Sequence, residues 1–133
     1  MRHSPLAPAL VVCLAWSCGE SSAPEPAPAQ DARVSIAADI AFTEGPTVYR
    51  DGSVFFSELR SNRTLRYYPQ SGLVETFRAD SHGTNGMIFD SEWRLISCEG
   101  DPPRVTRMNV ETGALEVLAE RYEGQRLNHP NDV

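Results

Sequence analysis

The sequence predicts an all-β fold made of repeated four-stranded sheets, the blades of a β-propeller. Its main support is an internal repeat, because a shift of 41 positions places Gly45 on Gly86 and aligns like residues after it. Each copy has four short apolar runs separated by polar or glycine-containing turns, in a period of roughly 40 residues. The runs are rich in β-branched and aromatic residues, and none has a sustained helical period. The aligned pairs are Val54 with Leu95, Glu58 with Glu99, Arg63 with Arg104, Arg66 with Arg107, Gly72 with Gly113, Glu75 with Glu116 and Phe77 with Leu118.

The first 18 residues predict a secretory signal peptide. Arg2 and His3 precede a run at residues 6–16 that is apolar but too short to span a bilayer. Residues 14–19 resemble a bacterial lipobox, in which Cys18 is the lipidated residue. Two interpretations stay open, a lipoprotein anchored through Cys18 and a plainly secreted protein. Both imply export to the periplasm or the outer cell surface, with a lipid anchor as the only expected membrane contact.

A stretch rich in proline, alanine and serine follows this leader. Residues 19–33 contain no large apolar side chain, and their prolines remove amide donors, so we expect a flexible linker. The repeat domain is then residues 34–133. Residues 34–37 are expected to form a strand that completes the last blade of a closed propeller.

The strands are expected where apolar runs lie between turns. The first repeat places them at residues 47–49, 54–58, 64–68 and 73–78, and the second at residues 87–89, 94–98, 105–109 and 115–119. Residues 120–126 lengthen the next connection, and residues 127–133 begin a third repeat. Because propellers close with about four to eight blades, we expect this chain to be the N-terminal part of a longer protein.

Three oxygen-bearing side chains stand at matching positions of the repeats. Glu44 and Asn85 precede the two repeat glycines, and Asn131 stands at the corresponding place in the third copy. The innermost strands of a propeller surround its central channel, so these side chains are expected to converge there. One carboxylate and two amides are hard ligands that suit Ca²⁺ or Mg²⁺, with Mn²⁺ or Zn²⁺ less favoured. An ordinary role in turns stays open for all three.

Composition excludes some classes of partner and site. The formal charge is −6, from 18 acidic and 12 basic residues, and no basic stripe is present, so nucleic acid is not an expected partner. Cys98 is the one cysteine in the repeats and is expected to be a buried apolar residue instead of a nucleophile.

Charged residues that recur in both repeats have a structural interpretation. Glu58 recurs as Glu99 and Arg63 as Arg104, which favours a structural ion pair or a role in turns over catalysis. Arg60 and Arg104 remain candidates to face a sugar-acid substrate.

Several motifs resemble the gluconolactonase, senescence-marker-protein and luciferin-regenerating-enzyme family. They are Glu44-Gly45-Pro46, residues 51–57, Asn85-Gly86-Met87, residues 94–99 and, most specifically, residues 126–133 with the sequence Arg-Leu-Asn-His-Pro-Asn-Asp-Val. The resemblance covers nearly everything from residue 34 to the end.

This resemblance implies a six-bladed propeller with one divalent cation, usually calcium, in the central channel. Glu44 matches the family's first-blade glutamate ligand, and Asn131 matches the asparagine of its Pro-Asn-Asp motif, at the metal and the substrate. Asn85, Asn128 and His129 are then expected to line the channel or its mouth and to face the substrate. The aspartate that serves the family as general base belongs to a later blade and has no counterpart in this chain.

The function implied by the resemblance is calcium-dependent hydrolysis of a small-molecule sugar lactone, with water attacking a metal-polarised carbonyl. Whether this segment is active by itself stays open, because the base is not among its residues. Two alternatives remain: a related propeller that hydrolyses organophosphates or other lactones, and a non-catalytic extracellular propeller that binds a ligand or a protein at its mouth.

Overall fold

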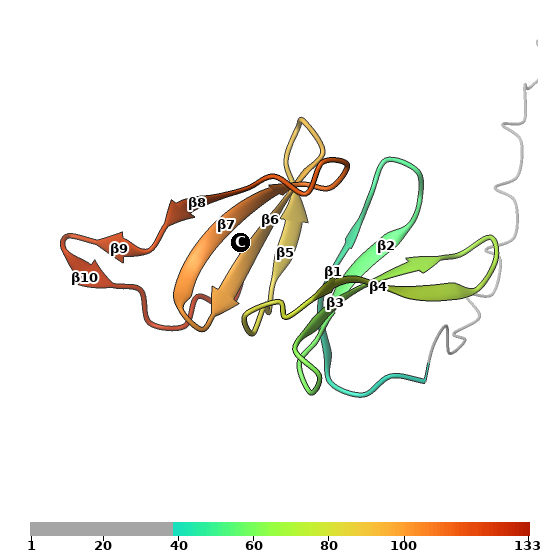
Figure 1. Ribbon diagram of the computed structural model, residues 1–133, viewed down its shortest axis with the longest axis horizontal. Helices are drawn as coiled ribbons and strands as arrows, with labels where there is room; N and C mark the ends of the chain where they lie inside the picture. The colour runs from blue at the N-terminus through green and yellow to red at the C-terminus, as the bar shows by residue number, and fades with distance from the viewer. Residues whose placement is uncertain (1–38) are drawn as a thin grey trace, which may run out of the picture. The chain divides into compact units, whose positions relative to one another are not determined.

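The computed structural model describes residues 39–133, which form ten antiparallel β-strands (Figure 1). The predicted signal peptide, the linker, Cys18 and the strand expected at residues 34–37 lie outside the described residues. Residues 39–133 contain no helix long and apolar enough to cross a membrane. The strands are β1 Thr43–Val48, β2 Val54–Glu58, β3 Arg63–Tyr68, β4 Leu73–Ala79, β5 Met87–Phe89, β6 Arg94–Gly100, β7 Pro103–Asn109, β8 Leu115–Ala119, β9 Arg121–Tyr122 and β10 Gln125–Arg126.

The strands form two four-stranded sheets and a small hairpin. Sheet 1 has the order β1-β2-β3-β4 and sheet 2 the order β5-β6-β7-β8, each with consecutive strands hydrogen-bonded side by side. The registers repeat as well, because Thr47 pairs with Phe55 and, 41 positions later, Ile88 pairs with Ile96. The predicted pair of repeated four-stranded units is therefore confirmed.

Five of the eight expected strands have different bounds in the structure, and β1 differs most. The innermost strand of sheet 1 begins at Thr43 instead of residue 47, because Thr43 pairs with Glu58 and Glu44 with Ser57. An irregularity between Glu44 and Thr47 accommodates the intervening Gly-Pro dipeptide.

The connection at residues 120–126 is also more ordered than expected. It contains the hairpin β9–β10, whose turn residues Glu123 and Gly124 both have positive φ, at 48° and 79°. Two consecutive left-handed residues suit a tight two-residue turn, and a glycine in the second position favours it.

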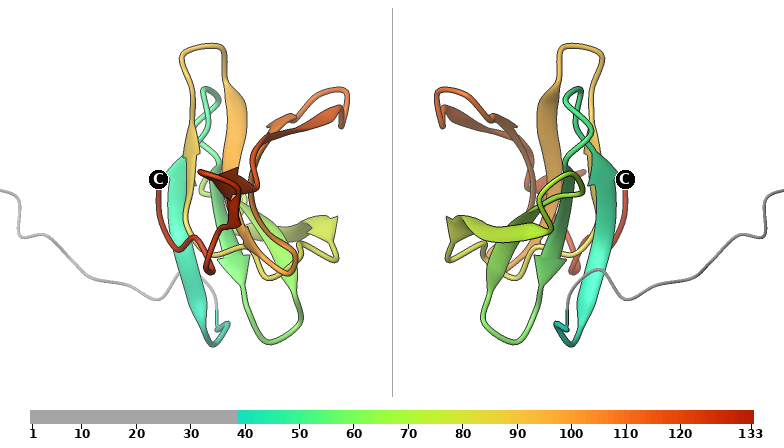
Figure 2. Two further views of the ribbon diagram at one scale, coloured as in Figure 1. Left: turned by 90° about the vertical axis from the view of Figure 1, so that its left-hand side faces the viewer. Right: turned by 90° about the vertical axis from the view of Figure 1, so that its right-hand side faces the viewer.

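The apolar core lies between the two sheets (Figures 1 and 2). Phe55 of β2 is fully buried, with its ring centroid 4.8 Å from Phe77 of β4 and 5.2 Å from Phe89 of β5. Edge-on aromatic contacts of this kind add to the free energy gained from area burial. Tyr49, Phe55, Met87 and Leu95 are the buried members, and Phe77, Phe89 and Val110 pack against them.

A charged network joins the sheets next to this core. Glu99 of β6 is fully buried and lies 2.7 Å from both Arg78 of β4 and Arg104 of β7. Thr106 donates a third hydrogen bond to the same carboxylate. Burial opposes ionisation of Glu99, but these donors outweigh it and hold the pKa of the carboxyl below its usual value. Together with the Arg63–Glu58 pair, the contacts confirm structural ion pairs at the recurring charges.

Candidate functional site

The predicted site residues lie at one edge of the sheets. Glu44 is near the start of β1, Asn85 lies two residues before β5, and Asn131 belongs to the terminal segment, residues 127–133. Antiparallel pairing puts the β2–β3 and β6–β7 turns at this edge too, as Figure 1 shows along its lower side. The β1–β2 and β5–β6 turns lie at the opposite edge.

Asn85 and Asn131 meet directly. The Nδ2 of Asn85 donates a hydrogen bond to the Oδ1 of Asn131 over 2.8 Å. The backbone supports this contact, because Gly86 N donates to the carbonyl of Asn131 and Asn85 N donates to the carbonyl of Cys98. Two amides that are 46 positions apart in the sequence are thus held side by side.

Glycines allow these backbone segments to approach one another. A Cβ atom on Gly86 would lie 2.6 Å from the carbonyl oxygen of Asn131, and one on Gly45 would lie 2.8 Å from the Cα of Gly86. Gly45 also has a φ of 53°, a conformation that costs other residues energy. The glycines that follow Glu44 and Asn85 are therefore required by packing, which explains why both repeats have a glycine at this position.

Glu44 is joined to Asn85 through Ser57. The buried Oγ of Ser57 lies 3.0 Å from the carbonyl oxygens of both Glu44 and Asn85. The Glu44 carboxylate itself is exposed and has no ion pair within residues 39–133. The structure brings the backbones of these two residues together and leaves the carboxylate free to bind a ligand.

Sequence reasoning missed Ser57. Its repeat counterpart is Cys98, which is also fully buried. The expected burial of Cys98 is confirmed, and burial together with the nearby Asp132 charge raises the pKa of its thiol, which disfavours the thiolate. The sequence did contain a signal for this position, because in both repeats a small side chain, Ser57 or Cys98, directly precedes the recurring glutamate.

Asn128 and His129 are exposed members of the terminal segment. His129 has a φ of 44°, and its Nδ1 lies 3.3 Å from where a Cβ on Gly100 would stand. Neither residue has a hydrogen bond to Asn85 or Asn131 within the described chain, so their expected contact with substrate stays a prediction. The third innermost strand is not formed, because residues 127–133 have no β-ladder partner and touch sheet 2 through the Gly86–Asn131 hydrogen bond.

The donor set has the chemistry of a hard-cation site. Residues 39–133 contain no cluster of three or more His, Cys, Asp or Glu side chains able to hold a metal ion. Glu44 supplies a carboxylate, and Asn131 supplies an amide oxygen that keeps a second lone pair after accepting from Asn85. Oxygen donors of this type fit Ca²⁺ or Mg²⁺ better than softer metals.

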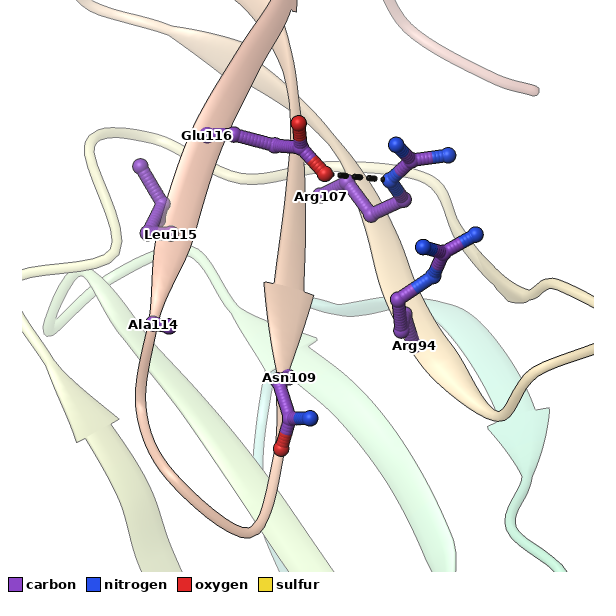
Figure 3. Close-up of a pocket in the computed structure, with 6 residues that line it drawn as sticks. All are labelled: Arg94, Arg107, Asn109, Ala114, Leu115 and Glu116. Carbon is purple, nitrogen blue, oxygen red and sulfur yellow. Dashed lines mark hydrogen bonds and ion pairs between the residues drawn. The ribbon is translucent and has the colours of Figure 1, made fainter.

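A hollow of about 160 Å³ lies at the opposite edge of sheet 2 (Figure 3). Its walls include Arg94 and Arg107, which pair with Asp90 and Glu116. These arginines are neutralised by carboxylates, and the hollow contains none of the predicted site residues.

Comparisons with known proteins agree with this architecture. Residues 42–133 match the family described as the SMP-30/gluconolactonase/LRE-like region. A gluconolactonase of Zymomonas mobilis is 24% identical over 111 residues, which are 74% of this chain and 31% of that protein.

Solved structures give the same result. A gluconolactonase of Xanthomonas campestris is 32% identical with a TM-score of 0.64, over 70% of this chain and 31% of that one. A second structure from the gluconolactonase family is 34% identical with a TM-score of 0.65, over 72% and 33% of the two chains. A virginiamycin B lyase of Staphylococcus aureus, at 18% identity and a TM-score of 0.53, shares the fold alone. This chain thus spans about a third of the length of these relatives, and it belongs to the SMP-30/gluconolactonase/LRE-like family.

Proposed function

We propose that this chain contributes to a calcium-dependent hydrolase of sugar lactones. The observation that carries the proposal is the direct contact of the Asn85 and Asn131 amides, with Glu44 one repeat earlier and tied to Asn85 through Ser57. Relatives that match over most of the chain are gluconolactonases. Their name supports a lactone as the substrate of this protein.

In this proposal Glu44 and Asn131 hold the cation, as the resemblance also implies. A bound divalent cation supplies positive charge that polarises the lactone carbonyl. The negative charge of Glu44 offsets part of the cation's charge. Asn85 fixes the orientation of the Asn131 amide through its 2.8 Å hydrogen bond and keeps its own Oδ1 free to accept a hydrogen bond from a sugar hydroxyl.

Asn128 and His129 belong to the same proposal as residues that face the substrate at the channel mouth. Both are exposed on the segment that delivers Asn131. The general base is expected from another part of the propeller, for which we propose six blades. Export through residues 1–18, with Cys18 as a lipid attachment site, completes the proposal.

The test is hydrolysis of D-glucono-1,5-lactone by the full-length protein, followed as acid release above the spontaneous rate. Removing divalent cations with a chelator should abolish turnover, and adding Ca²⁺ back should restore it. Glu44→Gln should lower kcat/KM by about 100-fold, because it removes the one carboxylate of the donor set. Calcium affinity, measured by calorimetry, should fall in the same variant.

The matched control is Glu92→Gln, which makes the same chemical change at an exposed residue of the β5–β6 turn, at the opposite edge. It should leave turnover and calcium affinity unchanged. Full activity in the chelated protein, or equal calcium affinity in wild type and Glu44→Gln, would contradict the proposed site.

A further inference from the structure

The β2–β3 turn, residues 59–62, connects the two backbone segments that carry Glu44 and Asn85. On one side, Leu59 N donates a hydrogen bond to the carbonyl of Phe42 over 3.1 Å, two residues before Glu44. On the other side, Ser81 N donates to the carbonyl of Asn62 over 2.8 Å, in the connection that leads to Asn85. We call residues 59–62 the bridging turn.

Asn62 holds the bridging turn firmly against that connection. Its Oδ1 accepts a hydrogen bond from Gly83 N over 2.7 Å, and its Nδ2 donates to the carboxylate of Asp80 over 2.7 Å. Ser81 Oγ also donates to the same Oδ1. Asn62 has a φ of 52°, a conformation that asparagine tolerates better than most residues. The bridging turn is therefore fixed relative to both segments of the candidate site.

Arg60 projects from the middle of this fixed turn. Its guanidinium carbon lies 4.8 Å from the centre of the Phe42 ring, and both side chains are exposed. Stacking on an aromatic face orients a guanidinium plane without neutralising its charge.

Arg60 also differs from most arginines of the described chain. Within residues 39–133 its guanidinium has no carboxylate within 4.0 Å. The arginines that do have one are Arg50, Arg63, Arg66, Arg78, Arg94, Arg104 and Arg107. An oriented cation with no counter-ion among residues 39–133 thus lies against Phe42, two residues before Glu44, on the turn that bridges the two segments of the site.

We propose that Arg60 selects lactones that themselves carry a carboxylate, the lactones of sugar diacids, by binding that carboxylate at the rim of the site. The inference rests on the proposed lactone hydrolysis and adds the class of substrate. A guanidinium offers two parallel N–H donors that match a carboxylate, and the ion pair strengthens both hydrogen bonds. A neutral lactone can accept hydrogen bonds from a guanidinium but has no negative charge to pair with it.

The test compares two lactones in the full-length protein, neutral D-glucono-1,5-lactone and anionic D-glucaro-1,4-lactone. Arg60→Ala should lower kcat/KM for the anionic lactone by about 10- to 100-fold, mainly through KM, and change the value for the neutral lactone less than about twofold. Arg60→Lys should recover part of the lost kcat/KM for the anionic lactone, because lysine keeps the positive charge but lacks the two parallel N–H donors of the guanidinium. Added salt should weaken the preference of the wild type and leave Arg60→Ala unaffected.

The matched control is Arg50→Ala, which removes the same charge from the turn at the opposite end of β1, where Arg50 pairs with Glu111. It should leave both lactones unaffected. Equal losses for both lactones in Arg60→Ala, or no loss for either, would overturn the proposal.

Direct binding separates this inference from the proposed function. Calorimetric titration with glucarate, a dianion that needs no turnover, should show weaker binding to Arg60→Ala than to wild type. If the wild type hydrolyses neither lactone but shows this difference, the lactonase proposal fails and the anion site stands. Equal glucarate binding in both proteins overturns the anion site whatever the lactonase result.

Discussion

The two sheets carry the same pattern of side chains, but among residues 39–133 only sheet 1 has a neighbouring sheet on the corresponding face. On sheet 1 this face presents Phe55 and Phe77, and sheet 2 covers it so completely that Phe55 is 0% exposed. The repeat counterparts on sheet 2 are Ile96 and Leu118, and Leu118 is 42% exposed. At both pairs of equivalent positions the side chain is therefore more buried in sheet 1 than in sheet 2.

Charged residues show the same contrast. Arg66 lies 5.0 Å from the centre of the Phe55 ring and 4.8 Å from that of Tyr68, within the packed face of sheet 1. Its counterpart Arg107 borders the open hollow of sheet 2 and pairs with Glu116 (Figure 3). Burial in a repeat protein thus depends on the next unit as well as on the sequence of the unit itself, because each repeat contacts its neighbours.

The largest effect is expected from truncating the covered face. Phe55→Ala should lower the free energy of unfolding by about 3–5 kcal/mol, because it leaves a cavity between the sheets. Ile96→Ala, at the equivalent position, should cost only about 1 kcal/mol, since that side chain is partly exposed. Urea denaturation followed by fluorescence measures both, and equal losses would show that the face of sheet 2 is covered in solution.

The next effect concerns the glycines that bring the two innermost segments together. Gly45→Ala should cost about 3 kcal/mol, from left-handed strain and from the clash with the backbone of Gly86. Gly72→Ala is the matched control, because Gly72 has a φ of 71° but nothing within 4 Å of an added Cβ. It should cost only about 1 kcal/mol, from strain alone. If thermal denaturation shows the same loss in both variants, close approach between the segments is not what selects glycine at position 45.

The smallest effect compares the recurring glutamates. Glu99→Gln should destabilise the chain by about 2 kcal/mol at neutral pH, more than Glu58→Gln, because Glu99 has two arginine partners and Glu58 has one. The pKa of Glu99 is lowered on folding, so its stabilisation is present above the ordinary value of 4.5 and is lost as pH falls below it toward the folded pKa. The gap between wild type and Glu99→Gln should therefore shrink in unfolding experiments from pH 7 to pH 3. If the difference in unfolding free energy between the two proteins does not change with pH, the charge of the Glu99 carboxylate is not its cause.

Most of the fold could be predicted from the sequence because each strand is a local pattern between turn residues. The boundaries of β2, β5 and β8 agree with the prediction, and the recurrence of Glu58 and Arg63 indicated a structural role, which the structure shows to be an ion pair. The start of β1 could not be found this way, because Gly45 and Pro46 normally interrupt a strand, and only pairing with β2 shows that they form an irregularity within one.

The candidate site, like the fold, could be predicted from the sequence only in part. The sequence alone determined which residue types stand at the matching positions of the three repeats, Glu44, Asn85 and Asn131, and hence the hard oxygen chemistry that they offer. Only the tertiary structure decided that Asn85 and Asn131 touch, that Ser57 joins Glu44 to Asn85, and that Arg60 lies against Phe42 with no carboxylate of residues 39–133 within 4.0 Å. Spacing along a chain specifies local hydrogen bonding, whereas contacts between distant residues depend on how whole sheets pack, which no short stretch of sequence contains.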